Sequence, residues 1–345
     1  MNSLISHFQN GALVAVMAHG MVGISLIWDK VLLKNPGTRN LYSYIFWLGA
    51  MSIFAVVLVF FGYTSISLGM VGIAFAAGAL DLVGSYFYYA ALKMGEASET
   101  LAIMGGFAPI ATAALSYALL SKQMTHSQLW GFCLMTTGGF VMFFAEDLDW
   151  KRILPPVLMA SGSFGLVNVL EKLVYNRTNF VTGYVWFALG TFCGSMALLI
   201  PPSWRRQIFA ESEHAKPSSR AGYFANRFIN GLGSFLVFYA ISLTHPAVVN
   251  AIGGVRYAVI FLGAYLLTKF KPSWLKENFS GRELITKSVG TGFVIAGVIV
   301  VGLAGGKSTA GIWLNPLHLL NAHAERLQAA LVQTWRAIGR VALRL

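Results

Sequence analysis

An internal duplication limits the folds open to this chain more than any other pattern in its sequence. Short motifs in the first half return in the second half in the same order. The matched motifs are Asp29-Lys30 with Glu171-Lys172, Tyr89-Ala90 with Tyr239-Ala240, Gly105-Gly106 with Gly253-Gly254, and the pair Gly131 and Gly138 with the pair Gly290 and Gly297. A duplication of this kind fixes the architecture before any single element is assigned.

The composition places the two copies in a membrane. Of the 345 residues, 56% are hydrophobic and only 11% are charged, whereas soluble domains are about 25% charged. The 36 glycines agree, because small residues let membrane helices approach closely. The net charge of +12 comes from basic residues in the breaks between apolar runs, where they meet lipid headgroups. We therefore expect no nucleic-acid partner.

Ten apolar stretches are long enough to cross a bilayer, which takes about 20 residues for about 30 Å of hydrocarbon. They are residues 11–28, 41–62, 70–92, 99–120, 128–145, 153–173, 181–201, 221–243, 246–268 and 286–305. Lipid offers the backbone no hydrogen-bond partners, so each stretch should be a helix. A polar break of about 20 residues joins the seventh and eighth stretches. We thus predict an all-α integral membrane protein of ten transmembrane helices.

Five helices in each copy is an odd number, so the copies should lie in opposite orientations, as an inverted repeat that holds its substrate near the membrane midplane. We predict repeats at residues 1–147 and 148–306, followed by a tail at 307–345. Apolar tail residues share one helical face while arginines occupy the other, which predicts a basic amphipathic helix in the headgroup plane. The apolar face consists of Leu320, Ala324, Leu327, Leu331, Trp335, Ile338, Ala342 and Leu345, opposite Arg336, Arg340 and Arg344. A partner-binding helix is the alternative.

With Tyr89-Ala90, Pro109 and the glycine-containing helix that begins at Gly131, the chain resembles the ten-helix EamA-type transporters of the drug/metabolite transporter superfamily. The resemblance spans residues 11–305 and implies transport of small metabolites such as amino acids or nucleotide sugars. One position departs from the family pattern, because Ser121-Lys122 stands where the family usually has Gly-Glu. A role of that glutamate is therefore not transferred to this chain.

Arg256 is the sharpest candidate for a functional residue, because it falls near the centre of the ninth stretch. An arginine there costs about 2.5–3.5 kcal/mol on insertion scales, so it should face a wet cavity or a partner. It either binds substrate or forms a buried pair with Asp81 that locks the halves together. Asp81 is the only carboxylate well inside a stretch, and either proton coupling or a fixed counter-charge would suit it.

Polar residues at helical spacing form one face on the eighth stretch and a comparable face on the third. The faces are Arg227, Asn230 and Ser234 on the eighth and Asp81, Ser85 and Tyr88 on the third. Inverted repeats bring these two helices to the same cavity, so we expect the faces to converge. Arg227 has a second interpretation: instead of facing the cavity, its long side chain could place the charged group at the nearby membrane interface.

Four further positions have a structural and a functional interpretation. Asn168 either adds an amide to the cavity or joins helices by hydrogen bonds. His19 is either a structural histidine or a proton relay. Asp29-Lys30 and Glu171-Lys172 end their stretches, where we expect them to anchor the helices at the interface, with lysine complementing the helix dipole.

Together these features predict a secondary active transporter for a small polar, anionic or zwitterionic metabolite, working by alternating access of the two repeats. The expected partners are a small-molecule substrate, membrane lipids at the tail, and a coupling proton. No enzyme or nucleotide-hydrolysing motif stands in a usable context, and the two cysteines have no metal-ligand spacing, so we expect no enzyme, no metal and no cofactor. One alternative is a flippase for a phosphorylated lipid. The other is a non-transporting scaffold or sensor, which predicts a filled centre with Asp81 and Arg256 paired.

The sequence gives two conflicting indications of orientation. Breaks after the odd-numbered stretches carry more Lys and Arg than the others, which favours both termini outside. The family resemblance implies cytoplasmic termini in a bacterial inner membrane, and the basic tail suits the anionic cytoplasmic leaflet. We favour cytoplasmic termini.

Overall fold

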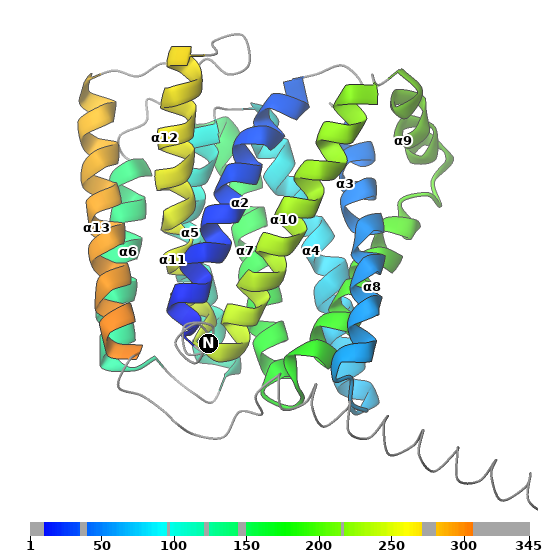
Figure 1. Cartoon of the computed structure of the whole chain (residues 1–345), viewed down its shortest axis with the longest axis horizontal. Helices are drawn as coiled ribbons and strands as arrows, with labels where there is room; N and C mark the ends of the chain where they lie inside the picture. The colour runs from blue at the N-terminus through cyan, green and yellow to red at the C-terminus, as the bar shows by residue number, and fades with distance from the viewer. Residues whose placement is uncertain are drawn as a thin grey trace, which may run out of the picture.

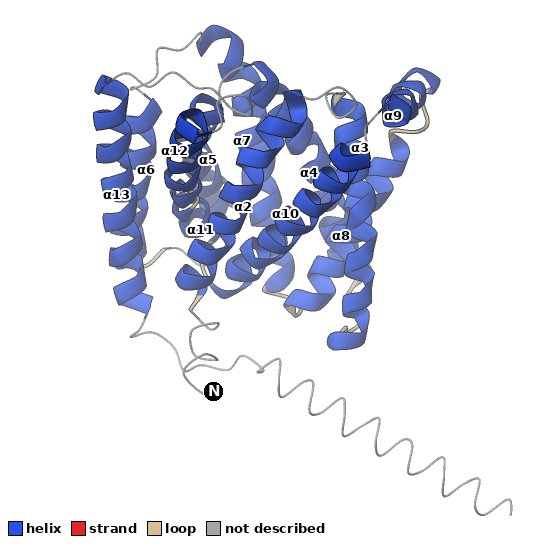
Figure 2. Ribbon diagram, turned by 45° about the horizontal axis from the view of Figure 1, so that its top comes forward, coloured by secondary structure: helices blue, strands red, loops and turns tan. Residues whose placement is uncertain are grey.

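In the computed structural model, residues 10–34, 40–94, 97–120, 124–143, 150–214, 217–270 and 281–305 are described, and every regular element within them is a helix. The long helices run side by side and alternate in direction, as Figure 1 shows. A view turned by 45° shows the same all-helical bundle (Figure 2). The predicted tail helix and the Ser121-Lys122 break lie outside the described residues.

Each of the ten predicted stretches contains helix in this structure. The elements are α2 (Gly11–Lys34), α3 (Leu41–Ala50) with the 3-10 helix η1 (Met51–Phe61), α4 (Leu68–Met94), α5 (Ala97–Leu119), α6 (His126–Phe143), α7 (Trp150–Tyr175), α8 (Phe180–Ala197), α9 (Pro202–His214), α10 (Pro217–Leu243), α11 (Pro246–Ile252), α12 (Gly254–Phe270) and α13 (Gly281–Gly305). Two features were not expected. Helix α9 occupies the polar break, and Gly253 separates α11 from α12 within the ninth stretch.

Seven helical segments among the described residues are long and apolar enough to cross a membrane. They are Gly11–Leu33, Leu41–Phe61, Leu68–Met94, Lys151–Tyr175, Phe180–Ala197, Pro246–Phe270 and Leu284–Gly302. The finding confirms an integral membrane protein built from helices. Helix α10 is not among the seven because Arg227, Asn226 and Asn230 reduce its apolar character. The total of ten spans stays a prediction.

The glycines repeated in the sequence form one helix–helix contact between α6 and α13. A Cβ atom at Gly138 would lie 2.6 Å from the Gly290 carbonyl oxygen, and one at Gly131 would lie 2.9 Å from the Gly297 carbonyl oxygen. The reverse substitutions at Gly290 and Gly297 would each place Cβ 2.7 Å from the opposing carbonyl. These four positions therefore let two backbones approach as closely as membrane helices can.

A second close contact, between α4 and α8, gives a testable prediction. A Cβ atom at Gly78 would overlap the Phe187 carbonyl oxygen, and one at Gly190 would overlap the Phe75 carbonyl oxygen. Because the obstacle is backbone, Gly190→Ala should force the helices apart and destabilise the protein by about 1–3 kcal/mol. The matched control is Gly72→Ala on α4, where no atom lies within 4 Å. Equal melting temperatures for the two variants would contradict the packing described.

His245, between α10 and α11, gives a prediction about pH. Its Nδ1 accepts the Ala247 N–H at 3.3 Å and so caps α11. Burial, and then the charge of Lys172, lower the pKa of His245 to about 4. The unfolded chain, with a histidine pKa of about 6.5, therefore binds the extra proton, and stability should fall as the pH falls from about 6.5 through about 4.

His245→Asn isolates this effect, since asparagine caps helices well and does not titrate in this range. Its melting temperature should decline less than that of the wild type between neutral pH and pH 4. Parallel declines in the two proteins would show that His245 is not responsible.

Candidate functional site

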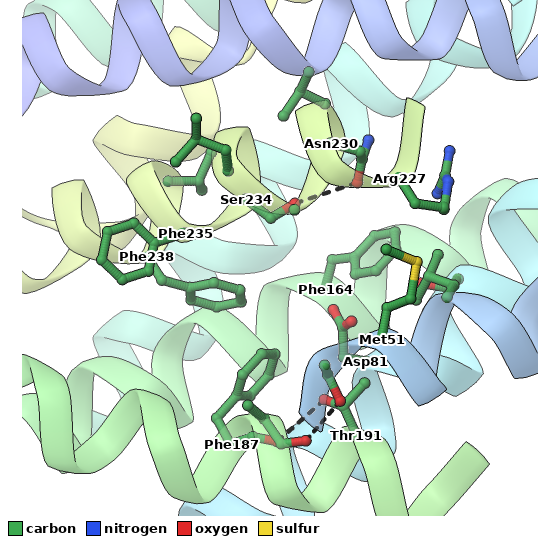
Figure 3. A pocket seen from close by; sticks show the side chains of 18 of the residues that line it. Met51, Asp81, Phe164, Phe187, Thr191, Arg227, Asn230, Ser234, Phe235 and Phe238 are labelled. Carbon is green, nitrogen blue, oxygen red and sulfur yellow. Dashed lines mark hydrogen bonds between the residues drawn. The ribbon is translucent and has the colours of Figure 1, made fainter. Parts of the chain in front are cut away.

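A cavity of about 530 Å³ lies among the helices, and six of the candidate residues from the sequence line it, whereas the candidate proton relay His19 does not. The six residues are Asp81, Tyr88, Asn168, Arg227, Asn230 and Arg256. They come from α4, α7, α10 and α12, so both halves of the chain contribute. Figure 3 shows the Asp81 carboxylate opening into the same space as Asn230 and Ser234, whose side chains lie 3.5 Å apart. The predicted convergence of two polar faces is present in this geometry.

Arg227 forms an ion pair that the sequence analysis missed. Its Nη2 contacts Asp29 Oδ1, and the side chains of Arg227 and Asp29 are only 2% and 0% exposed. Asp29 also accepts a hydrogen bond of 2.5 Å from Asn226 Nδ2. The expectation that Asp29 anchors α2 at the interface is therefore wrong, and Arg227 does not extend its charge to the interface. The helix continues beyond Asp29 to Lys34, which places this carboxylate inside the bundle.

Tyrosines complete the surroundings of this ion pair. Tyr44 donates to Asp29 Oδ1 at 2.5 Å, and Tyr89 donates to Oδ2 at 3.1 Å while accepting from Arg227 Nη1 at 2.8 Å. The guanidinium carbon lies 5.1 Å from the ring centroid of Tyr44 and 5.5 Å from that of Tyr223. Buried charges are stable only when they are paired and hydrogen-bonded in this way. The charge of Arg227 is therefore already compensated by Asp29.

Arg256 is held differently, by a histidine. Its Nε donates to His19 Nδ1 at 2.8 Å, and His19 Nε2 lies 2.8 Å from the Val249 carbonyl oxygen. Because a carbonyl only accepts, Nε2 carries the proton and Nδ1 is the acceptor. Both ring nitrogens are thus engaged, so His19 orients Arg256. Among the described residues no carboxylate forms an ion pair with Arg256, and the pair with Asp81 is not formed.

Asp81 also lines the cavity, and no described basic side chain pairs with it. No hydrogen bond or ion pair involves its carboxylate within the part of the chain that the structure describes. Two described titratable groups, Glu171 and Tyr184, lie within electrostatic range of it, and neither is basic. An ionised carboxylate in such surroundings is unfavourable, so Asp81 is suited to binding a proton.

The remaining candidates take part in polar contacts between helices. Asn168 Nδ2 donates to Asn250 Oδ1 at 2.9 Å, and Asn250 Nδ2 donates in turn to Thr112 Oγ1. These bonds join α7, α11 and α5 beside the cavity. Tyr88 is buried, and its hydroxyl has no hydrogen-bond partner among the described residues. It lies within electrostatic range of Arg256, and both residues line the cavity.

The two lysines of the repeated motif donate hydrogen bonds to backbone carbonyls at equivalent positions of the two repeats. Lys30 Nζ donates to the Leu92 carbonyl at 2.6 Å, and Lys172 Nζ donates to the Ser242 carbonyl at 2.9 Å. Leu92 follows Tyr89 by the same interval that separates Ser242 from Tyr239. Both lysines complement the carboxyl end of a helix, but the helix is a neighbouring one. The repeated Asp/Glu-Lys motif was the signal that these positions lie inside the fold.

Comparison with known proteins gives a family and a fold. Residues 9–144 match the model of the EamA-like transporter family, which confirms the resemblance over that part of the chain. A solved crystal structure, described only as a protein, is similar with a TM-score of 0.54 and 16% sequence identity. The alignment covers 88% of this chain and 98% of that one, so the likeness concerns the fold alone. Among curated proteins, no significant match is found.

Proposed function

Because residues 9–144 are an EamA-like transporter region, of the drug/metabolite transporter superfamily, we propose that the protein is a secondary active transporter of a small anionic or zwitterionic metabolite. One observation carries the proposal. Arg256 lines the central cavity, is oriented by His19, and has no carboxylate partner among the described residues. A cation inside a membrane is costly without compensation, and an anionic group on a substrate would supply it.

The geometry of Arg256 suggests how such a group would bind. With Nε engaged by His19, the two terminal nitrogens are left to donate to two oxygens of a carboxylate or phosphate, which is the bidentate geometry that guanidinium favours. The unpartnered Tyr88 hydroxyl would add a third donor. Arg227, neutralised by Asp29, is assigned a structural role in this proposal. The site thus contains one substrate-binding arginine.

The packing supports alternating access by two inverted repeats. Helix α10 packs on α2, and α4 packs on α7. Since α2 corresponds to α7 and α4 to α10 in the two repeats, a two-fold axis relating the repeats would convert one of these contacts into the other. The equivalent bonds of Lys30 and Lys172 and the reciprocal glycine contacts of α6 and α13 follow the same symmetry. Each copy therefore contributes helices to both sides of the cavity, and rocking of one group against the other would open it alternately.

Asp81 is the proton-coupling residue in this scheme. Its carboxyl faces the cavity that would hold the substrate (Figure 3), and no described basic side chain neutralises it. Binding a proton there removes an unfavourable buried charge. Movement of the proton with or against the substrate would then draw on the proton gradient.

The second candidate function is a flippase, because residues that line the cavity are exposed on the side of the helix bundle. The cavity lining includes Phe54 of η1 and Phe228 of α10, whose side chains are 72% and 69% exposed. An apolar opening between η1 and α10 would admit acyl chains while Arg256 binds a phosphorylated headgroup. The scaffold hypothesis is disfavoured by the cavity and by the separation of Asp81 from Arg256.

Thermal stabilisation of the purified protein distinguishes these candidates. A ligand at about 100 times its Kd stabilises by about 2.7 kcal/mol. Metabolites with a carboxylate or phosphate should raise the melting temperature of the wild type, and their neutral analogues should not. Anionic lipids alone raising it would favour the flippase. Arg256→Ala should abolish either response, and stabilisation that persists in this variant would contradict the assigned site.

The inner membrane and cytoplasmic termini are part of the same proposal. The basic tail motivates this orientation, since the cytoplasmic leaflet is the anionic one. We expect a reporter fused after Leu345 to be active in the cytoplasm. Activity of a reporter that works only in the periplasm would reverse the orientation.

A further inference from the structure

Glu171, near the carboxyl end of α7, is buried in an unusual way. The residue is 0% exposed, and neither carboxylate oxygen has a hydrogen-bond partner among the described residues. One turn later Tyr175 is 3% exposed, and its hydroxyl is also without a partner. The hydroxyl faces the Glu171 carboxyl. We expected Glu171 to anchor its helix at the membrane interface, and its full burial shows that this expectation is wrong.

The groups that face Glu171 carry no positive charge. From α4 comes Asp81, from α8 comes Tyr184, and from α7 itself comes Tyr175. No described basic side chain forms an ion pair with Glu171. The ammonium group of the next residue, Lys172, lies against the Ile241 and Ser242 carbonyls of α10.

The internal repeat shows how exceptional this is. Asp29, the counterpart of Glu171, is paired with Arg227. By the interval that matches Tyr89 with Tyr239, the counterpart of Arg227 in the first half is Ala77. Of the two equivalent carboxyl groups, Asp29 therefore has a guanidinium partner on the other copy, whereas the position that would supply one for Glu171 is an alanine.

We infer that Glu171, buried behind the cavity wall, is a second proton-binding group that works with Asp81, which lines the cavity. The inference rests on the proposed transport function. An ionised Glu171 would be a buried charge without a partner, which is unfavourable, whereas a protonated carboxyl is neutral and can donate a hydrogen bond. Since like charges disfavour one another, Glu171 and Asp81 do not ionise together in the closed protein.

The proton exchange itself needs no other reactant. In the state described here the proton stays on a Glu171 oxygen. When the repeats move and water reaches the residue, the O–H bond breaks, the proton passes to water, and the carboxylate is solvated. Reprotonation reverses these steps and permits closure.

Infrared spectroscopy of the full-length protein in lipid vesicles tests the inference with the proton as the only ligand. At neutral pH the wild type should show carbonyl stretches of protonated carboxyl groups. Glu171→Gln, which keeps the shape of the side chain, should remove one of them, and Asp81→Asn should remove another. Tyr175→Phe should shift the Glu171 band without removing it, because the hydroxyl that faces the carboxyl is lost.

A melting series over pH provides the second measurement. The melting temperature of the wild type should fall more steeply than that of Glu171→Gln as the pH rises above about 4.3, where the unfolded chain releases the Glu171 proton that the folded protein keeps. An unchanged infrared spectrum in Glu171→Gln would overturn the inference, because it would mean that Glu171 is ionised at neutral pH. Neither measurement involves transport, so this failure is distinct from failure of the proposed function, which Arg256→Ala decides.

Discussion

Arg227→Met should destabilise the protein by about 3–5 kcal/mol, because the change leaves Asp29 buried without a cation. Asp29 is 0% exposed, so water cannot replace the lost guanidinium. The Tyr44 and Tyr89 hydroxyls would still donate to the carboxylate, but they carry no positive charge. The expected result is a large fall in melting temperature and poor recovery of folded protein.

The double variant Asp29→Asn with Arg227→Met should recover much of this loss, because it leaves no charge in the site. Replacing a buried ion pair with neutral groups is often close to neutral in free energy. Arg205→Met on α9 is the control, since Arg205 is exposed and surface changes usually alter stability by less than about 0.5 kcal/mol. If Arg227→Met were as stable as the wild type but unable to transport, Arg227 would be a substrate-binding residue instead.

Much of the fold could be predicted, because membrane helices are recognisable in a sequence by their length and hydrophobicity. Each apolar stretch became helical, and the repeated glycines from Gly131 and Gly290 meet between α6 and α13. The cavity residues could be predicted for a related reason. Polar side chains such as Asp81, Asn230 and Arg256 are too costly to face lipid, so they converge on the interior.

The charge pairing could not be predicted, because it depends on which helices become neighbours. Asp29 and Arg227 are 198 residues apart in the sequence. They meet because α2 of the first repeat packs on α10 of the second repeat. The sequence suggested a pair between Asp81 and Arg256, since both lie well inside their stretches. Asp29 appeared to end its stretch, whereas α2 extends one further turn to Lys34. The error therefore lay in the position of a helix end.

Unlike Arg227, Arg256 should be dispensable for folding but not for transport. Removing it strands no carboxylate within the described structure, and His19 loses only one hydrogen bond, which costs about 1–3 kcal/mol. Arg256→Lys should rescue poorly, because an ammonium group cannot hold two oxygens in one plane. Combining Arg256→Ala with Asp81→Asn should restore nothing, since the two side chains form no ion pair.

Uptake of a stabilising anionic ligand into vesicles, measured together with melting temperature for wild type, Arg256→Ala and Arg256→Lys, tests this account most directly. We predict that both variants still fold, with a melting temperature lowered by no more than the loss of one buried hydrogen bond allows, that Arg256→Ala takes up none of the ligand and that Arg256→Lys takes up little. Uptake at the wild-type rate by folded Arg256→Ala would contradict the assignment of Arg256 as the substrate-binding cation.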